Sequence, residues 1–399
     1  MTITARSGTD RNFNLYIAAF SAVLYSVLLV APIVTSQLMV QFELDASSAG
    51  LLASVELGCF SLATLPAYLW LRRANIRTVT ILCGSLVVIG NVLSALMPTY
   101  GLLLLMRGLT ALAAGSITVI ILSLSAKTSK PSRSYGIFIV AQLGMGAIIL
   151  FLFPAIYAGK PVAAVYFTLA GLGLLCLPFA WCVKGHELSA KANPVEADAA
   201  GARRVLPFVA ALVAVFGFYV ALGGVWTFMA KIAETGGTEL GTASTTIGVA
   251  TLFGVASSLV GTLVGEGSRA KYYVLGGYAA MAAAMFLLFG APGLMRFALA
   301  AVLFKIAWSW LLPFLLAAVS RVGGAQVMNS TNLMIGSGLA VGPILAGAII
   351  DATGGFSAML TVSIVILAVS VACSVVVMRA PAAAEAPATE SEPAPAGAR

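Results

Sequence analysis

Two long apolar blocks, separated by one polar segment near the midpoint, dominate the pattern of this chain. The segment from Lys184 to Arg204 carries lysine, arginine, glutamate and aspartate side chains and an Asn-Pro pair, which interrupts regular structure. So many charges cannot lie in the hydrocarbon core of a bilayer. A polar segment between two apolar blocks of similar length is typical of a duplicated membrane protein.

Each apolar block divides into runs long enough to cross a bilayer, which takes about 20 helical residues. The runs predict twelve membrane-spanning helices, near residues 14–38, 46–70, 77–97, 101–125, 134–158, 161–182, 206–231, 241–265, 273–291, 295–320, 326–350 and 355–378. A membrane barrel would instead show short segments of alternating hydrophobicity. We therefore predict an all-α integral membrane protein built from two pseudo-symmetric six-helix bundles.

The same pattern divides the chain into five parts. We expect an N-terminal segment (1–13), a first bundle (14–182), a central loop (183–205), a second bundle (206–378) and a tail (379–399). The tail is rich in proline, alanine and glutamate, a composition that cannot bury a core, and we predict that it is disordered.

Composition agrees with a membrane protein and gives its orientation. The chain is 60% hydrophobic and 9% charged, against about 25% charged residues in ordinary globular domains. Its net charge of +8 comes from basic residues in short loops, which indicate topology rather than nucleic-acid binding. With the N-terminus inside, all basic residues fall on the inner side except Lys160, Lys231, Arg296, Arg107 and Lys305. We predict cytoplasmic termini and central loop in the inner membrane of a cell.

Several kinds of chemistry lack their sequence signals. There is no phosphate-binding loop of the G-x-x-x-x-G-K-[ST] type. The five cysteines lie in apolar runs without metal-type spacing. We expect no cofactor, no metal and no catalytic nucleophile, so the protein is not predicted to be an enzyme, and any active transport would draw on an ion gradient.

Three charged residues lie well inside predicted spans, away from the span ends. Glu56 is the one acid well inside a span, about 15 Å deep, and a carboxylate in a membrane is by default a functional hypothesis. We predict that Glu56 carries a coupling proton; the alternative is a static ion pair with Arg107. Arg107 and Lys305 lie at matching places in the two blocks. Two cations against one carboxylate leave room for an anionic ligand, which both would bind.

Helical spacing places uncharged residues on the faces that could line the same cavity. Tyr or Trp at such spacing can also form packing faces or interfacial belts, so packing is the alternative for each. The predicted substrate contacts are Tyr25, Gln142, Tyr219, Trp226, Trp308, Asn329 and Asn332.

Over residues 14–378 the chain resembles the major facilitator superfamily of transporters. The strongest match is the Gly-Pro-rich run from Gly336 to Asp351, and a loop signature rich in glycine and arginine recurs at 261–271 and, without its aspartate, at 69–77. The resemblance implies alternating access at a site between two halves, in a monomer. It assigns gating or loop roles to Arg72, Arg73, Gly261, Arg269, Gly338, Gly342 and Pro343.

The sequence therefore predicts a proton-coupled secondary transporter for a small organic anion, with an apolar or aromatic body. Its partners would be the substrate, protons and the lipid bilayer, and not nucleic acid. The alternative is an exporter of drugs or metabolites that are neutral or cationic, driven by proton antiport. A receptor or sensor on the same scaffold is disfavoured by the small central loop and tail, and an integral-membrane enzyme by the lack of catalytic groups.

Overall fold

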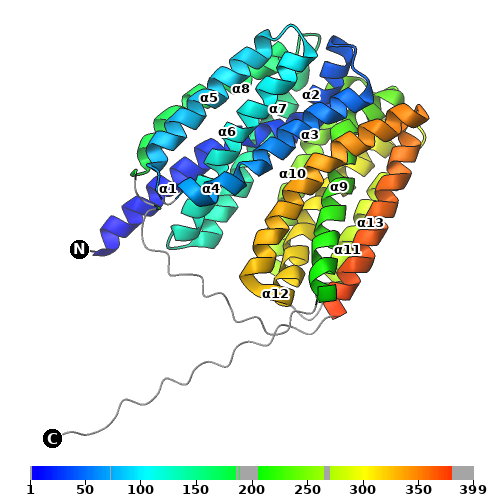
Figure 1. Ribbon diagram of the computed structural model, residues 1–399. Helices are drawn as coiled ribbons and strands as arrows, with labels where there is room; N and C mark the ends of the chain where they lie inside the picture. The colour runs from blue at the N-terminus through cyan, green and yellow to red at the C-terminus, as the bar shows by residue number, and fades with distance from the viewer. Residues whose placement is uncertain (1, 72, 186–187, 189–204, 265–269, 380–399) are drawn as a thin grey trace, which may run out of the picture.

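The computed structural model describes residues 2–71, 73–185, 188, 205–264 and 270–379. For 2–8, 68, 132, 205, 262, 317, 320–330 and 332 it describes the backbone alone. The described chain is helical throughout, apart from turns and short loops (Figure 1). Its elements are α1 (Thr2–Leu24), α2 (Ser26–Gln41), α3 (Ala46–Leu62), α4 (Thr64–Trp70), α5 (Ile76–Leu96), α6 (Tyr100–Lys127), α7 (Pro131–Ile156), α8 (Ala163–Cys176), the 3-10 helix η1 (Leu177–Cys182), α9 (Val205–Thr235), α10 (Leu240–Val264), α11 (Ala270–Leu287), α12 (Leu294–Thr353) and α13 (Phe356–Arg379).

Among these residues, eleven helical segments are long and apolar enough to cross a membrane. The shorter α11 completes the twelve spans, so the predicted all-α membrane fold is confirmed. Three spans are interrupted where the sequence predicted single helices. The first is divided into α1 and α2 at Tyr25, the second into α3 and α4 at Ala63, and the sixth ends in the 3-10 helix η1.

Two of the predicted spans, 295–320 and 326–350, lie within the bounds of one element, α12. The predicted loop between them falls within the bounds of this element, and the backbone turns back there (Figure 1). Phe304 in the first part (Leu294–Leu316) stacks on Trp226 of α9, and Leu339 in the second part (Leu333–Thr353) packs on Gly223 of the same helix. In a straight helix Phe304 and Leu339 would be about 50 Å apart. The two parts therefore run in opposite directions, as the yellow and orange ribbons of Figure 1 show.

The N-terminal half (α1 to η1) and the C-terminal half (α9 to α13) converge where α3 runs beside the second part of α12 (Figure 1). Glycines allow this approach, because a Cβ at Gly347 would overlap the backbone of Ala46, and one at Gly50 would overlap that of Pro343. We call this end, where α3 begins and α12 ends, the closed end. The halves diverge toward the N-terminal end of α1.

A proline supplies one of the polar links between the halves. Pro32 in α2 has no N–H, so the carbonyl of Leu28 loses its helical donor. The indole Nε1 of Trp226, in α9, donates a 2.8 Å hydrogen bond to that carbonyl. The proline therefore creates an acceptor in one half that a side chain of the other half satisfies.

The same arrangement recurs between α7 and α10. Pro154 leaves the carbonyl of Leu150 without its helical donor, and Ser244 Oγ donates to it at 2.8 Å. A third link joins α12 to α3, where the backbone N–H of Ile344 donates to Ser54 Oγ at 2.9 Å. All three links depend on close contact of the two halves.

At the closed end, a carboxylate of the C-terminal half bonds to the backbone of the N-terminal half. Asp351, at the end of α12, accepts hydrogen bonds from the backbone N–H groups of Ala46 at 3.0 Å and Ser47 at 2.6 Å. These are free donors of the first turn of α3, where a negative charge is favoured. Asp45 caps the same turn from its own chain segment by accepting from Ser48 N at 2.8 Å. The beginning of α3 thus receives one carboxylate from each half.

Candidate substrate cavity

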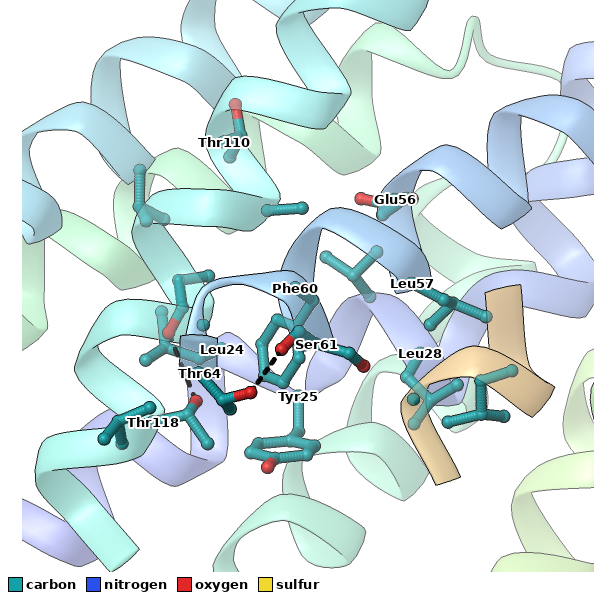
Figure 2. Close-up of a pocket in the computed structure, with 18 of the residues that line it drawn as sticks. Leu24, Tyr25, Leu28, Glu56, Leu57, Phe60, Ser61, Thr64, Thr110 and Thr118 are labelled. Atoms are coloured by element: carbon teal, nitrogen blue, oxygen red, sulfur yellow. Dashed lines mark hydrogen bonds between the residues drawn. The ribbon is translucent and has the colours of Figure 1, made fainter. Parts of the chain in front are cut away.

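A cavity of about 720 Å³ lies between the halves, mainly against α1 to α6 (Figure 2). The second part of α12 lines its other side through Leu333, Gly336 and Leu339, among others. The volume is in the range of small-molecule sites. From Glu56 the lining extends to Leu71, past the end of α4, and therefore away from the closed end.

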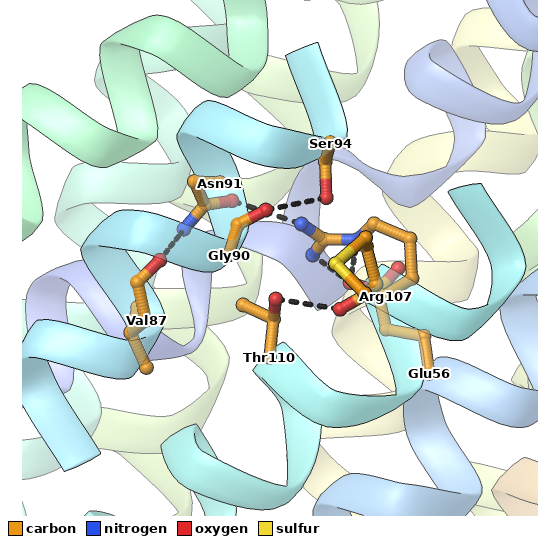
Figure 3. A network of polar contacts seen from close by, with 8 residues as sticks. Glu56, Val87, Gly90, Asn91, Ser94, Arg107 and Thr110 are labelled. Carbon is orange, nitrogen blue, oxygen red and sulfur yellow. Dashed lines mark hydrogen bonds and ion pairs between the residues drawn. The ribbon is translucent and has the colours of Figure 1, made fainter. Parts of the chain in front are cut away.

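An ion pair forms the polar part of the cavity wall (Figure 3). Arg107 Nε donates to Glu56 Oε1 at 2.8 Å, and Nη2 contacts the same oxygen. Arg107 Nη1 donates to Asn91 Oδ1 at 2.9 Å, and the guanidinium carbon lies 4.8 Å from the centre of the Tyr166 ring. The side chain of Arg107 is 1% exposed and that of Glu56 16%. The cation is thus enclosed by partners, while part of the carboxylate faces the cavity.

Small residues bring the helices that carry this pair together. A Cβ at Gly115 of α6 would overlap the carbonyl of Phe60 in α3, and one at Gly90 of α5 would overlap the hydroxyl of Thr110 in α6. Close approach at two glycines places α3 and α5 against the same helix, α6. The ion pair therefore depends on backbone packing as well as on its own charges.

Aromatic rings and hydroxyls form much of the remaining wall. Tyr25, at the junction of α1 and α2, packs its ring edge-on against Phe60 with 5.1 Å between centroids. Ser61, Thr64 and Thr118 add hydroxyl groups to the lining (Figure 2). The Thr64 and Thr118 hydroxyls already donate to carbonyls of their own chain neighbourhood. Such a wall suits a molecule with an apolar body and few polar groups.

Lys305 does not line this cavity, although the sequence placed it there beside Arg107. Its Nζ lies 3.7 Å above the ring centroid of Trp226 and 4.5 Å above that of Trp308. Both tryptophans were predicted as substrate contacts, and the structure gathers them around the lysine instead. We call these three residues the lysine cage.

Of the other predicted substrate contacts with described side chains, one lines the cavity and two lie outside its lining. Tyr25 lines it, whereas Gln142 is half-buried on α7 and Tyr219 is buried in α9, outside the lining. A Cβ at Gly338 would lie 2.7 Å from Tyr219 Cβ, and one at Gly342 would lie 2.5 Å from the α9 backbone. The glycines of α12 thus let that helix pack directly on α9.

Some predicted residues fall outside the description or away from the cavity. The side chains of Asn329, Asn332, Arg72 and Arg269 lie outside the described residues. Arg73 follows α4 in a turn, with its backbone N–H bonded to Trp70. Gly261 lies on α10, where a Cβ would come within 3.8 Å of Phe314. Their gating roles stay predictions.

The sequence reading missed Asn91, Tyr166 and Asp351. Asn91 is a buried amide well inside a predicted span, and that is the signal that could have identified it. Tyr166 is one of many aromatic residues in the spans and carries no such signal. Asp351 ends a glycine-rich helix, and only the packing of α12 on α3 reveals its partners.

A multi-pass helical protein whose two six-helix halves enclose a cavity has the architecture of a secondary transporter. The family model of the Major Facilitator Superfamily matches residues 15–336, and the chain belongs to this family. A bacterial homologue of the human lysosomal transporter Spinster, inward-facing and unoccupied, has a similar structure: TM-score 0.72, 15% identity, covering 95% of this chain and 98% of the other. The nucleoside transporter NupG has a TM-score of 0.63 at 14% identity, covering 95% and 98%. No curated protein matches by sequence.

Proposed function

We propose that this protein is a proton-coupled secondary transporter that moves a small organic anion across the inner membrane by alternating access. The observation that carries the proposal is the ion pair in the cavity wall. Among the described residues that line it, the charged side chains are Glu56 and Arg107, and they are paired with each other. Tyr25 and Phe60 would contact the apolar body of the substrate.

One guanidinium facing one carboxylate supports a simple coupling rule. A substrate carboxylate and Glu56 would compete for Arg107, because both are acceptors for the same donors. Protonation of Glu56 removes its charge and releases the guanidinium for the substrate. Anion and proton would then bind together and cross together, which is symport.

The partial exposure of Glu56 supports a second candidate, export of cationic or neutral compounds. The carboxylate faces the cavity while the guanidinium is enclosed by Glu56, Asn91 and Tyr166. A cation would bind Glu56 directly and compete with its proton, which is antiport. The two candidates therefore predict opposite effects of removing the carboxylate.

The test is Glu56→Gln, which keeps the size of the side chain but cannot exchange a proton. For anion symport we expect the variant to lose concentrative uptake driven by a pH gradient and to keep counterflow exchange. Proteoliposomes with and without a pH gradient, offered carboxylates, nucleosides and cationic dyes, measure both. Glu239→Gln, at an exposed carboxylate before α10 and outside the lining, is the matched control and should transport at the wild-type rate.

The outcomes separate the candidates. Concentrative, pH-driven uptake by Glu56→Gln at the wild-type rate would show that Glu56 does not carry the coupling. Loss of binding and exchange for a cationic dye, with anions never transported, would establish the exporter instead.

We also propose that the cavity extends toward the cytoplasm. It extends away from the closed end, and most basic residues flank the helices at the end opposite the closed end. A reporter enzyme fused after Arg204 should be active in the cytoplasm, and one fused near Glu239 should be active outside. If the fusion after Arg204 is inactive in the cytoplasm, the proposed orientation is wrong and the cavity faces the other side.

A further inference from the structure

The lysine cage encloses a buried amino group that does not line the cavity. Lys305 is 2% exposed, and its Nζ has no hydrogen-bond partner among the described residues. The rings of Trp226 and Trp308 contact the nitrogen instead. Cation–π contact replaces only part of the hydration that an ammonium loses on burial.

Charged groups on the surrounding helices do not balance this lysine. On α9, Lys231 and Glu234 pair with each other at 2.8 Å, and Tyr219 is uncharged at neutral pH. The residues of α10 and α2 include no ionisable side chain. On α11, which also packs on α12, Lys271 is a cation over the Tyr272 ring, and the Tyr278 hydroxyl bonds to Ser370 and Ser374. On α12, Asp351 is bonded to α3 and Arg296 to backbone carbonyls. An ammonium at Lys305 would thus be unpaired, as far as the described residues show.

The cage also lies on the seam between the halves. Trp226, which contacts Lys305, donates to the carbonyl of Leu28, and the side chain of Leu28 lines the cavity. On α9, Gly223 packs against Leu339, which lines the cavity, and Trp226 lies about one turn beyond Gly223 toward the end of the helix. The cage therefore separates the cavity from the closed end. When the halves part at the closed end, the link from Trp226 to Leu28 must break, and water gains access to Nζ from that side.

We propose that Lys305 is a second residue that binds and releases a proton during the cycle: it is neutral while the closed end is shut and takes up a proton from that side when it opens. The inference rests on the proposed function, because it requires alternating access. The proton binds the lone pair of Nζ on opening and returns to water before closure, so charge and atoms balance. In this scheme Glu56 exchanges its proton in the cavity and Lys305 exchanges its own on the opposite side.

The scheme fixes the sign of a pH effect on the conformational equilibrium. The open form binds one more proton than the shut form, so acid favours opening at the closed end. The ratio of open to shut molecules should change up to about tenfold per pH unit, over the range in which the two forms differ in protonation.

The experiment reports opening through a buried position near the closed end. Ser36 is fully buried on α2, about two turns beyond Leu28. Ser36→Cys, in a background with the five native cysteines replaced by alanine, is labelled in proteoliposomes with a membrane-impermeant maleimide between pH 5 and 9. Rates are corrected for thiolate content by labelling the same variant in denaturant. We expect the corrected rate to rise as the pH falls.

Three variants test the assignment. Lys305→Met should label slowly at every pH, and Lys305→Arg, which keeps its charge, should label fast at every pH. Glu56→Gln should keep the wild-type response, which separates this inference from coupling at Glu56. A wild-type response in Lys305→Met would overturn the proposal. Failure of both Lys305→Met and Lys305→Gln to fold would also overturn it, because loss of a buried amine that has no hydrogen-bond partner should not destabilise the protein.

Discussion

Replacing Arg107 with alanine is expected to lower the free energy of unfolding by about 3–5 kcal/mol, a typical cost of breaking a buried ion pair. Three of its donors bond to Glu56 and Asn91, and its side chain is 1% exposed. The variant would leave the carboxylate of Glu56 in the cavity wall without its cation and the amide oxygen of Asn91 without its donor. Denaturant unfolding in detergent micelles and the yield of folded protein in membranes measure the loss.

Two further variants make this expectation specific. Arg107→Met combined with Glu56→Gln leaves no unpaired charge and should recover most of the lost stability. Lys231→Ala breaks the other described ion pair, whose side chains are 28% and 22% exposed, and should cost at most about 1 kcal/mol. If Arg107→Ala unfolds at the wild-type denaturant concentration, the pair does not stabilise the N-terminal half.

The same contacts bear on mechanism. An arginine that is enclosed on all sides is not available to a substrate until one of its partners leaves. Glu56 is the partner that can leave without moving a helix, because a proton can neutralise it. This is why the ion pair, which the sequence offered as the static alternative, supports the coupling hypothesis rather than replacing it.

The helices could be predicted because burial in lipid imposes a length and a composition on each span. Their interruptions could not be predicted so well. The break at Tyr25 lies within an apolar run, and nothing in its hydropathy distinguishes it from its neighbours. Pro32 is visible in the sequence, and it leaves the carbonyl of Leu28 without a helical donor. The donor that replaces it is Trp226 of the other half, and the sequence alone does not show that contact.

The residues of the candidate site could also be predicted only in part. Depth along a helix placed Glu56 and Arg107 at neighbouring levels, and the structure pairs them. Matching positions in the two halves suggested that Lys305 shares their cavity. Depth does not specify the rotation of a helix about its axis, and the rotation of the first part of α12 directs Lys305 toward Trp226 of α9. Trp308, three residues farther along the same part of α12, completes the cage. That choice depends on side-chain packing between distant segments.

Contacts at the closed end show how conformational change could be controlled by backbone packing. Gly50 and Gly347 bring the backbones of α3 and α12 into direct contact, at Pro343 and Ala46 respectively. Asp351 adds hydrogen bonds to the first turn of α3. These contacts exist only while the closed end is shut. Any group that prevents them raises the free energy of the shut form and leaves the open form unaffected.

Gly347→Ala is therefore expected to shift the protein strongly toward the form that is open at this end. The added methyl would overlap the carbonyl of Ala46, and overpacking of this kind costs about 1–3 kcal/mol, which corresponds to a shift of about 5- to 150-fold. Labelling of Ser36→Cys by an impermeant maleimide measures it. Gly171→Ala, where no atom lies within 4 Å of the new methyl, is the matched control and should label as the wild type does.

Asp351→Asn should shift labelling in the same direction but less, because one acceptor oxygen remains. We expect Gly347→Ala to bind substrate and lose most of its turnover, since a transporter that cannot shut one end cannot complete its cycle. Equal labelling of Gly347→Ala and Gly171→Ala would show that the closed end is not held by this contact.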